Sequence, residues 1–309
     1  MATALSSTLK PEPQQSGSEP RKDSSMKTAN IGPTEKLSLT NDGQLEVFFI
    51  GTGSAFAKRH FQTNLLLVKG NTHLMVDFGM TGPLALETTA HLDRGEINNL
   101  LISHSHADHI GGLECLALNR RYVGIPFQKR PKLKMIITES YQEVLWDRSL
   151  RGGMEWNEEE ANSHKRLCFT DFFDPIRPGW LKKQPREVYE VDFEGLHLEM
   201  FRTKHIPDKA PDWQASFVSF GLFVDGHVFI SMDTRFDKDL LDEYADRSSV
   251  MFHDVQFFPG AVHAPLADLR TLPTEVKAKM HLMHYADNWE AQDIAGFAGW
   301  AEQGVRYIF

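Results

Sequence analysis

Residues 104–109 bring together side chains whose types and spacing could bind metal ions. They read His104-Ser-His106-Ala-Asp108-His109 and follow an apolar stretch that we expect to be a buried strand. His104 and His106 are two residues apart, so their side chains point the same way in an extended backbone. The turn into the following helix can direct Asp108 and His109 into the same cleft. Imidazoles with a carboxylate are preferred ligands of Zn²⁺, with Mn²⁺ as an alternative. A polar loop with surface histidines is the competing interpretation.

This motif, with Gly111-Gly112 following after one residue, resembles the metallo-β-lactamase superfamily, and the resemblance covers about residues 45–309. That superfamily places a third histidine, a bridging aspartate and a final histidine at strand ends. Candidates occur here in that order. His205 and His284 each follow an expected strand, and Asp233 lies in Ile-Ser-Met-Asp-Thr, with Met where the family has Gly. A lone histidine is more often a surface or core residue than a metal ligand. The prediction of a metal site therefore depends on the complete set of candidate ligands.

The resemblance implies a site for two metal ions, namely two Zn²⁺, with Mn²⁺ as the alternative. The implied ligands are His104, His106 and His205 for one ion, Asp108, His109 and His284 for the other, and Asp233 as the bridge between them. Two such cations would share a water and lower its pKa from about 15.7 towards about 7, giving a hydroxide nucleophile. Asp108 is also counted among the candidate catalytic residues. Asp77 resembles a family position that orients the histidines.

Two features indicate which branch of the superfamily this sequence resembles. Ribonuclease Z, which processes transfer RNA, has a long flexible arm between the third histidine and the bridging aspartate. Only 28 residues separate His205 from Asp233 here, which argues against a transfer-RNA substrate. His253-Asp254 and the segment that begins at His263 resemble the His-Glu and His-Ser-Thr motifs of ribonuclease Z and its small-molecule relatives. The resemblance implies that His263 is the general acid that protonates the leaving alkoxide. A surface histidine at the start of a helix is the alternative.

Four further stretches narrow the resemblance. They are similar to segments of the anti-Pycsar cyclic-nucleotide phosphodiesterases and their bacterial relatives, and they lie at residues 51–56, 145–153, 252–256 and 282–287. This likeness implies hydrolysis of small 3′,5′-cyclic nucleotides, including cyclic CMP and cyclic UMP, to linear monophosphates. It also implies two zinc ions and a homodimer.

The elements that must position these residues form two similar halves, each with strands followed by helices. This order predicts an α/β protein with an αββα sandwich, in which two sheets pack face to face with helices outside. The expected strands are 45–50, 64–69, 72–77, 98–103 and 132–137, then 188–192, 196–201, 216–224, 227–231, 250–252 and 281–284. The expected helices are 82–92, 113–122, 273–280 and 289–303.

Composition and charge limit the possible domain organisation, partners and location of the protein. Residues 1–43 are rich in Ser, Pro, Gln, Lys and Thr, so we expect a disordered tail before a hydrolase domain at 44–309, with an insertion at about 151–187. The net charge of −9 disfavours stable binding of nucleic-acid polymers. Apolar runs are too short for a membrane span, and two cysteines without a secretory signal predict a cytoplasmic protein.

Three other functions remain open on the residues alone. A lactone or thioester hydrolase could use the same dinuclear site, and a ribonuclease Z-like nuclease could use the same ligands. A nucleotide-binding protein without activity could use the same cleft, although a binder needs no activated water.

Overall fold

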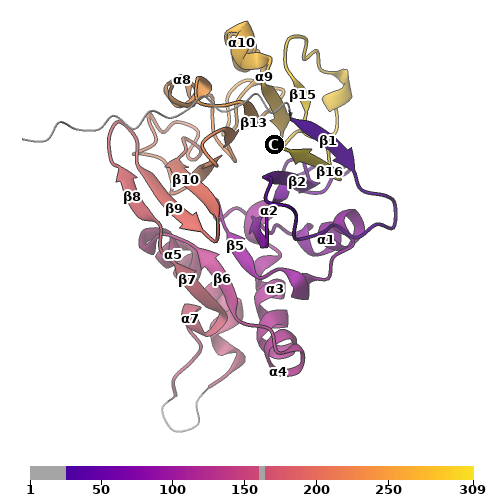
Figure 1. The fold of residues 1–309 in the computed structure, drawn as a ribbon. Coiled ribbons are helices and arrows are strands. Elements are labelled where there is room, and N and C mark those ends of the chain that lie inside the picture. Colours follow the sequence, from indigo (N-terminus) through magenta and orange to yellow (C-terminus); the bar gives the residue numbers. More distant parts are fainter. Residues whose placement is uncertain (1–25, 160–163) are drawn as a thin grey trace, which may run out of the picture.

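The computed structural model describes residues 26–159 and 164–309, which form two mixed sheets packed face to face (Figure 1). The rings of Phe49 and Phe252, one from each sheet, lie 5.1 Å apart in the apolar layer between the sheets. Helices cover the outer faces, with α1 and α3 beside the first sheet and α8 to α10 beside the second. The predicted αββα sandwich is confirmed.

The first sheet has eight strands in the order β1-β16-β2-β3-β4-β5-β6-β7. Their bounds are β1 Lys27–Asn30, β2 Glu46–Gly51, β3 Asn64–Lys69, β4 Thr72–Val76, β5 Asn99–Leu101, β6 Leu133–Ile136, β7 Phe173–Ile176 and β16 Val305–Ile308. The second sheet has the order β15-β14-β13-β12-β11-β10-β9-β8. Its bounds are β8 Gly179–Lys182, β9 Val188–Phe193, β10 Leu196–Arg202, β11 Phe220–Val224, β12 Val228–Ile230, β13 Val250–Asp254, β14 Met280–Met283 and β15 Gly299–Trp300.

The helices are short and join these strands. The α-helices are α1 Gly82–Ala90, α2 Ala107–Ile110, α3 Leu113–Asn119, α4 Ile125–Gln128, α5 Glu139–Leu145, α6 Arg151–Met154, α7 Phe169–Phe172, α8 Lys238–Ala245, α9 Leu266–Leu269 and α10 Thr274–Lys277. Short 3₁₀ or π turns are η1 Arg94–Glu96, η2 Arg120–Gly124, η3 Trp146–Leu150, η4 Glu155–Asn157 and η5 Trp289–Ala291. None of the described helices is both long and apolar enough to cross a membrane.

Strand direction brings the candidate residues to one edge of the sandwich. In the first sheet β4, β5 and β6 run parallel, and in the second β12, β13 and β14 do. Strand β10 runs in the same direction as β12, because both are antiparallel to β11. The carboxyl ends of parallel strands meet at one edge of a sheet, which is where open α/β sheets place their sites.

The described chain is ordered before the predicted domain boundary. Strand β1, at Lys27–Asn30, pairs with β16, and Leu37 is only 3% exposed. The prediction of a disordered tail is therefore wrong for residues 26–43, because these residues complete the edge of the first sheet. Residues 1–25, the rest of that predicted tail, lie outside the described residues.

Two other expectations differ from the structure. The segment 151–187, predicted to be an insertion, contains β7 and β8, the edge strands of the two sheets, so it is the link between them. Residues 160–163 of this segment lie outside the described part. The predicted helix at 289–303 is wrong, since the chain forms η5, a loop and β15. Its aromatic spacing arises because Trp289 and Trp300 both pack on Tyr285, with ring centroids 5.4 and 5.1 Å away.

A buried histidine on β4 predicts a pH dependence of stability. The Asn98 N–H donates to His73 Nε2 at 3.0 Å, which requires a neutral ring. Burial, together with the charge of Arg120, lowers the pKa of His73 to about 4 against the opposing charges of Glu194 and Glu96. The unfolded chain therefore binds the proton more readily, and the free energy of unfolding should fall as the pH drops from 6.5 to 4, by up to about 3 kcal/mol.

Urea denaturation of the wild type and His73→Gln tests this expectation, because glutamine can accept the same hydrogen bond without titrating. The wild type should lose more stability than the variant between pH 7 and pH 4. Equal losses in the two proteins would contradict the assignment to His73.

Candidate metal centre and active site

Seven predicted ligands converge at this edge from four loops. The β5–α2 turn carries His104 and His106, and α2 itself carries Asp108 and His109, while His205, Asp233 and His284 follow β10, β12 and β14. Their ligand atoms fall into two groups that share Asp233, and the atoms within each group lie within 4.8 Å of one another. The structure thus brings together every residue of the predicted set.

The first group holds three histidines around Asp233. His205 Nε2 lies 3.1 Å from His106 Nδ1, and Asp233 Oδ2 lies 3.6 Å from His104 Nε2 and 3.7 Å from His205 Nε2. His104 and His205 are fully buried, whereas His106 is half-buried. The buried His104 Nε2 has no hydrogen-bond partner among the described residues.

The second group lies on the other side of Asp233. His109 Nε2 lies 3.1 Å from Asp233 Oδ2 and 3.3 Å from Asp108 Oδ2. His284 Nε2 lies 3.2 Å from Asp108 Oδ2 and 3.6 Å from Asp233 Oδ1. All four residues are buried, and Asp233 faces both groups with its carboxylate, as a bridging ligand would.

The outer nitrogens of three histidines are held by other groups. Ser103 Oγ contacts His104 Nδ1 at 3.0 Å, and His205 Nδ1 donates to the Val262 carbonyl at 2.8 Å. His109 Nδ1 lies 2.6 Å from Asp77 Oδ2, and Asp77 also accepts from the Ser103 N–H and hydroxyl. These contacts leave each Nε2 directed at the centre, which is the usual arrangement of metal-ligating histidines.

Electrostatics give this donor set the charge state that a cation requires. Burial lowers the pKa of His104 well below its ordinary value and that of His205 to about 4, so both rings offer a neutral nitrogen. Burial opposes ionisation of Asp233, but His109, His284 and His263 together lower its pKa well below the ordinary range. Neutral imidazoles and ionised carboxylates are the forms that bind metal, so these residues fit divalent cations. His109 is the exception: burial opposes its protonation, but the carboxylates of Asp233, Asp108 and Asp77 raise its pKa well above the ordinary value, so a cation would displace a proton from this ring.

The centre is built on strained backbone. Asp77, Met232 and His284 have φ values of 61°, 47° and 60°, in the left-handed region that non-glycine residues rarely adopt. Met232 stands where the resembled family has glycine, and its conformation gives a reason for that glycine. Strain of this kind clusters at functional sites, where the surrounding structure enforces it.

Gly79 allows the Asp77 turn to approach the histidine motif. A Cβ at this position would lie 1.8 Å from the Asp108 carbonyl oxygen. Gly79→Ala is expected to push these two segments apart, to lower the free energy of unfolding by about 2 kcal/mol or more and to weaken metal retention. Thermal melts and metal analysis of the variant check this, with Gly152→Ala as the control, since a Cβ there meets no atom within 4 Å. Equal behaviour of the two variants would contradict the close approach.

His263 lies beside the cluster on a carboxylate support. Its Nδ1 is 2.9 Å from Asp254 Oδ2, and the Thr234 N–H donates to that oxygen at 3.2 Å. The His263 ring centroid is 4.6 Å from that of His284. Burial opposes protonation of His263, but the carboxylates of Asp233, Asp254 and Asp108 raise its pKa above the ordinary value. His263 is thus suited to hold a proton. It lies at the edge of the centre, which differs from the alternative interpretation of a surface histidine.

Gln256 is a site residue whose role the sequence did not reveal. Its Nε2 donates to the carbonyls of Phe258, at 2.9 Å, and Gly260, while its Oε1 accepts from the His263 N–H at 3.3 Å. The side chain therefore spans the loop that ends at His263. The segment 252–256 was singled out by resemblance, but only the folded loop shows what its glutamine does.

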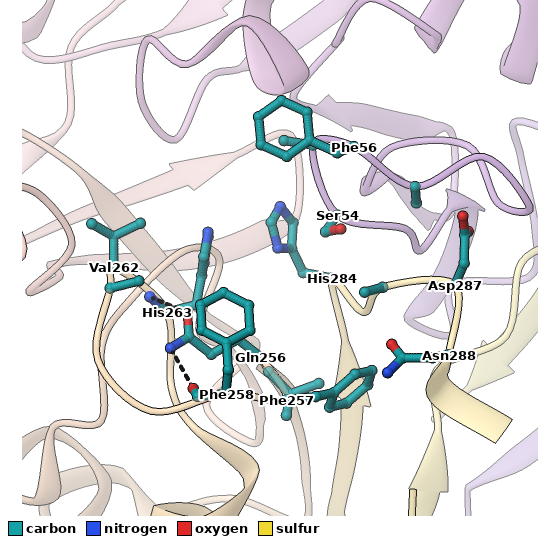
Figure 2. Close-up of a pocket in the computed structure, with 15 residues that line it drawn as sticks. Ser54, Phe56, Gln256, Phe257, Phe258, Val262, His263, His284, Asp287 and Asn288 are labelled. Carbon is teal, nitrogen blue, oxygen red and sulfur yellow. Dashed lines mark hydrogen bonds between the residues drawn. The ribbon is translucent and has the colours of Figure 1, made fainter. Parts of the chain in front are cut away.

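A cavity of about 760 Å³ opens beside the cluster (Figure 2). His263 and His284 form part of its wall, so it is continuous with the candidate metal centre. The rest comes from the loop at 54–57, the loop at 255–262 and residues 286–288. In Figure 2 the His284 ring lies between the rings of Phe56 and Phe258.

The sandwich with a histidine–aspartate cluster at one edge defines a protein of the metallo-β-lactamase fold. The metallo-β-lactamase fold protein YhfI from Bacillus subtilis aligns with a TM-score of 0.64 at 14% identity, covering 86% of this chain and 100% of YhfI. The short form of human tRNase Z aligns with a TM-score of 0.53 at 17% identity, covering 79% of this chain and 94% of that structure. These likenesses show the fold alone.

The particular family follows from the sequence match. Residues 45–307 match the family described as Anti-Pycsar protein Apyc1, and the chain belongs to this family. A relative of that name from Paenibacillus harenae is 38% identical over 245 residues, covering 79% of this chain and 90% of the relative. Another from Bacillus phage 010DV004 is 34% identical over 268 residues, covering 85% and 98%. The predicted resemblance is confirmed.

Proposed function

We propose that this chain is a metal-dependent phosphodiesterase that hydrolyses 3′,5′-cyclic nucleotides to linear monophosphates. One observation carries the proposal furthest: His263 lies within reach of the histidine–aspartate cluster, with Nδ1 on Asp254 and the ring at the wall of a cavity. A positioned imidazole suits a reaction that expels a poor leaving group such as a ribose alkoxide. Membership of the Anti-Pycsar protein Apyc1 family supports the same substrate class.

The proposed ligand set is the one implied by the sequence. His104, His106 and His205 would hold one ion and Asp108, His109 and His284 the other, with Asp233 shared. We infer Zn²⁺ in both positions, with Mn²⁺ as the alternative, because neutral imidazoles and carboxylates suit both ions. When bound, two divalent cations supply Lewis acidity towards phosphoryl oxygens and a water of lowered pKa.

The protein's own groups perform the remaining tasks. Asp77 fixes the His109 ring through its 2.6 Å contact with Nδ1, which keeps the opposite nitrogen directed at the centre. Asp254 fixes His263 in the same way, leaving Nε2 as the nitrogen that gives its proton to the departing ribose oxygen. As oxygen from water joins phosphorus, the bond from phosphorus to that ribose oxygen breaks and the oxygen takes up this proton.

The chain between His205 and Asp233 supports a small substrate. It contains a loop, β11, a short turn and β12, and these elements account for all the residues of the interval. The long arm of ribonuclease Z therefore has no counterpart in it. The net charge of −9 also disfavours a stable complex with a nucleic-acid polymer, whose phosphates are negatively charged.

A homodimer and a cytoplasmic location remain inferences from the resemblance. Met80, just before α1, and Leu84, on α1, are each 56% exposed, and exposed apolar side chains of this kind suit a subunit interface. Light scattering of the purified protein at several concentrations tests the dimer, and a monomer at all concentrations would contradict it.

A substrate panel tests the proposed function against its competitors. The metal-loaded protein is assayed with 3′,5′-cyclic nucleotides, lactones, thioesters and a precursor transfer RNA, and kcat/KM values are compared. The cyclic nucleotides should rank first. A higher kcat/KM for a lactone or thioester would show that the protein is a carboxyl-ester or thioester hydrolase. A higher kcat/KM for the precursor transfer RNA would show that it is a nuclease. Stoichiometric binding of an intact nucleotide would indicate a non-catalytic binder.

A further inference from the structure

Two exposed phenylalanines stand at the cavity beside the candidate metal centre. Phe56 is 92% exposed and Phe258 is 58% exposed, and both line the cavity that His263 and His284 border. They come from different loops, and in Figure 2 their rings lie on two sides of His284. Large apolar side chains left this open at a cavity mark a surface that binds another molecule.

We propose that the nucleobase of the substrate occupies this cavity between Phe56 and Phe258, and that the two rings are its stacking partners. The inference rests on the proposed function, and it assigns residues to the part of the substrate that does not react. Stacking on aromatic side chains is favourable for every base, because each base has a π-face. A volume of about 760 Å³ is within the size range of ligand cavities.

Each of the two loops is fixed by one polar side chain. The Asp287 carboxylate accepts from the N–H groups of Lys58 and Arg59 at 2.9 Å, directly after Phe56. The Gln256 amide holds the loop of Phe258 through its bonds to the Phe258 and Gly260 carbonyls. The rings are thereby presented on held loops, and less ordering entropy is lost when a ligand inserts between them.

The polar lining is largely occupied by these internal contacts. Gln256 uses both ends of its amide, and Asp287 uses both carboxylate oxygens. In the described part of the chain, the side chains of Ser54 and Asn288 are the other neutral polar groups of the wall, and neither has an internal hydrogen bond. Ring stacking is therefore the main interaction that this wall can offer to a base.

The test uses the full-length, metal-loaded protein and two matched substrates. One is cyclic AMP and the other is 1-deoxyribose 3′,5′-cyclic phosphate, which carries the same phosphodiester without a base. Phe56→Ala and Phe258→Ala should each raise KM for cyclic AMP about 10-fold with little change in kcat. Neither should change KM for the baseless substrate. Phe127→Ala is the control, because Phe127 is 78% exposed on α4, away from this cavity.

Other results would overturn the assignment. An unchanged KM for cyclic AMP would exclude stacking, and equal losses on both substrates would show that the rings act through the loops. A change in oligomeric state of Phe56→Ala would place Phe56 at a subunit interface instead. If the wild type hydrolyses no cyclic nucleotide, the proposed function fails, but calorimetry with a phosphorothioate analogue of cyclic AMP still tests the stacking. An equal Kd for the wild type and both variants would then reject it.

Discussion

His263→Ala should lower kcat for a 3′,5′-cyclic nucleotide by about 10²- to 10⁴-fold while leaving the metal content unchanged. The expected loss follows from the position of the ring, whose Nδ1 contacts Asp254 and which lies outside the proposed seven-residue ligand set. Asp233, Asp254 and His263 also lie close enough together to hold an ion, so a fall in metal content in His263→Ala would instead make His263 a ligand. The variant cannot supply a proton to the ribose oxygen as its bond to phosphorus breaks, so the alkoxide must leave unaided.

The leaving group provides the sharpest check on this role. A phosphodiester with a 4-nitrophenolate leaving group needs little protonation, so His263→Ala should hydrolyse it at close to the wild-type rate. His164→Ala is the matched control, because that side chain is 82% exposed and distant from the centre in sequence. Equal losses on both leaving groups would mean that His263 acts in binding or folding and not as an acid.

Asp233→Asn should have a still larger effect, because one carboxylate belongs to both ligand groups. Its Oδ2 faces His104, His109 and His205, and its Oδ1 faces His284. An amide offers one neutral oxygen in place of two charged ones, so metal content should fall at both positions. Activity should drop by about 10⁴-fold or more, since the Lewis acidity and the activated water come from the cations.

Two companion variants separate this effect from a general loss of structure. Asp192→Asn removes a carboxylate whose side chain is 84% exposed, and it should keep both metal content and activity. Asp254→Asn should keep the metal but lose activity, because it weakens the support of His263 without changing any residue of the proposed ligand set. Full metal content in Asp233→Asn, measured by elemental analysis after gel filtration, would contradict the bridging position.

Local pattern was enough to predict part of the centre. His104, His106, Asp108 and His109 lie within the turn after β5 and the helix α2 that follows it, so their convergence follows from short-range geometry. His205, Asp233 and His284 were found through their order along the chain, and sheet topology then explains why three distant strand ends meet. These residues converge because parallel strands bring their carboxyl ends to one edge.

What sequence could not predict depends on contacts between distant segments. Strand β1 exists because Lys27–Asn30 pairs with Val305–Ile308 at the other end of the chain, and its own composition resembles a disordered tail. The aromatic residues at 289–303 have helical spacing, yet Trp289 in η5 and Trp300 in β15 pack on Tyr285 from two separate elements. The loop contacts of Gln256 and Asp287 likewise depend on a fold that no local pattern records.

The most direct test of the central claim is the fate of 3′,5′-cyclic nucleotides mixed with the zinc- or manganese-loaded protein, with products resolved by chromatography. The wild type should convert them to linear monophosphates, and conversion should stop with a chelator and in His104→Ala. Intact cyclic nucleotides after prolonged incubation with fully metallated wild-type protein would contradict the account.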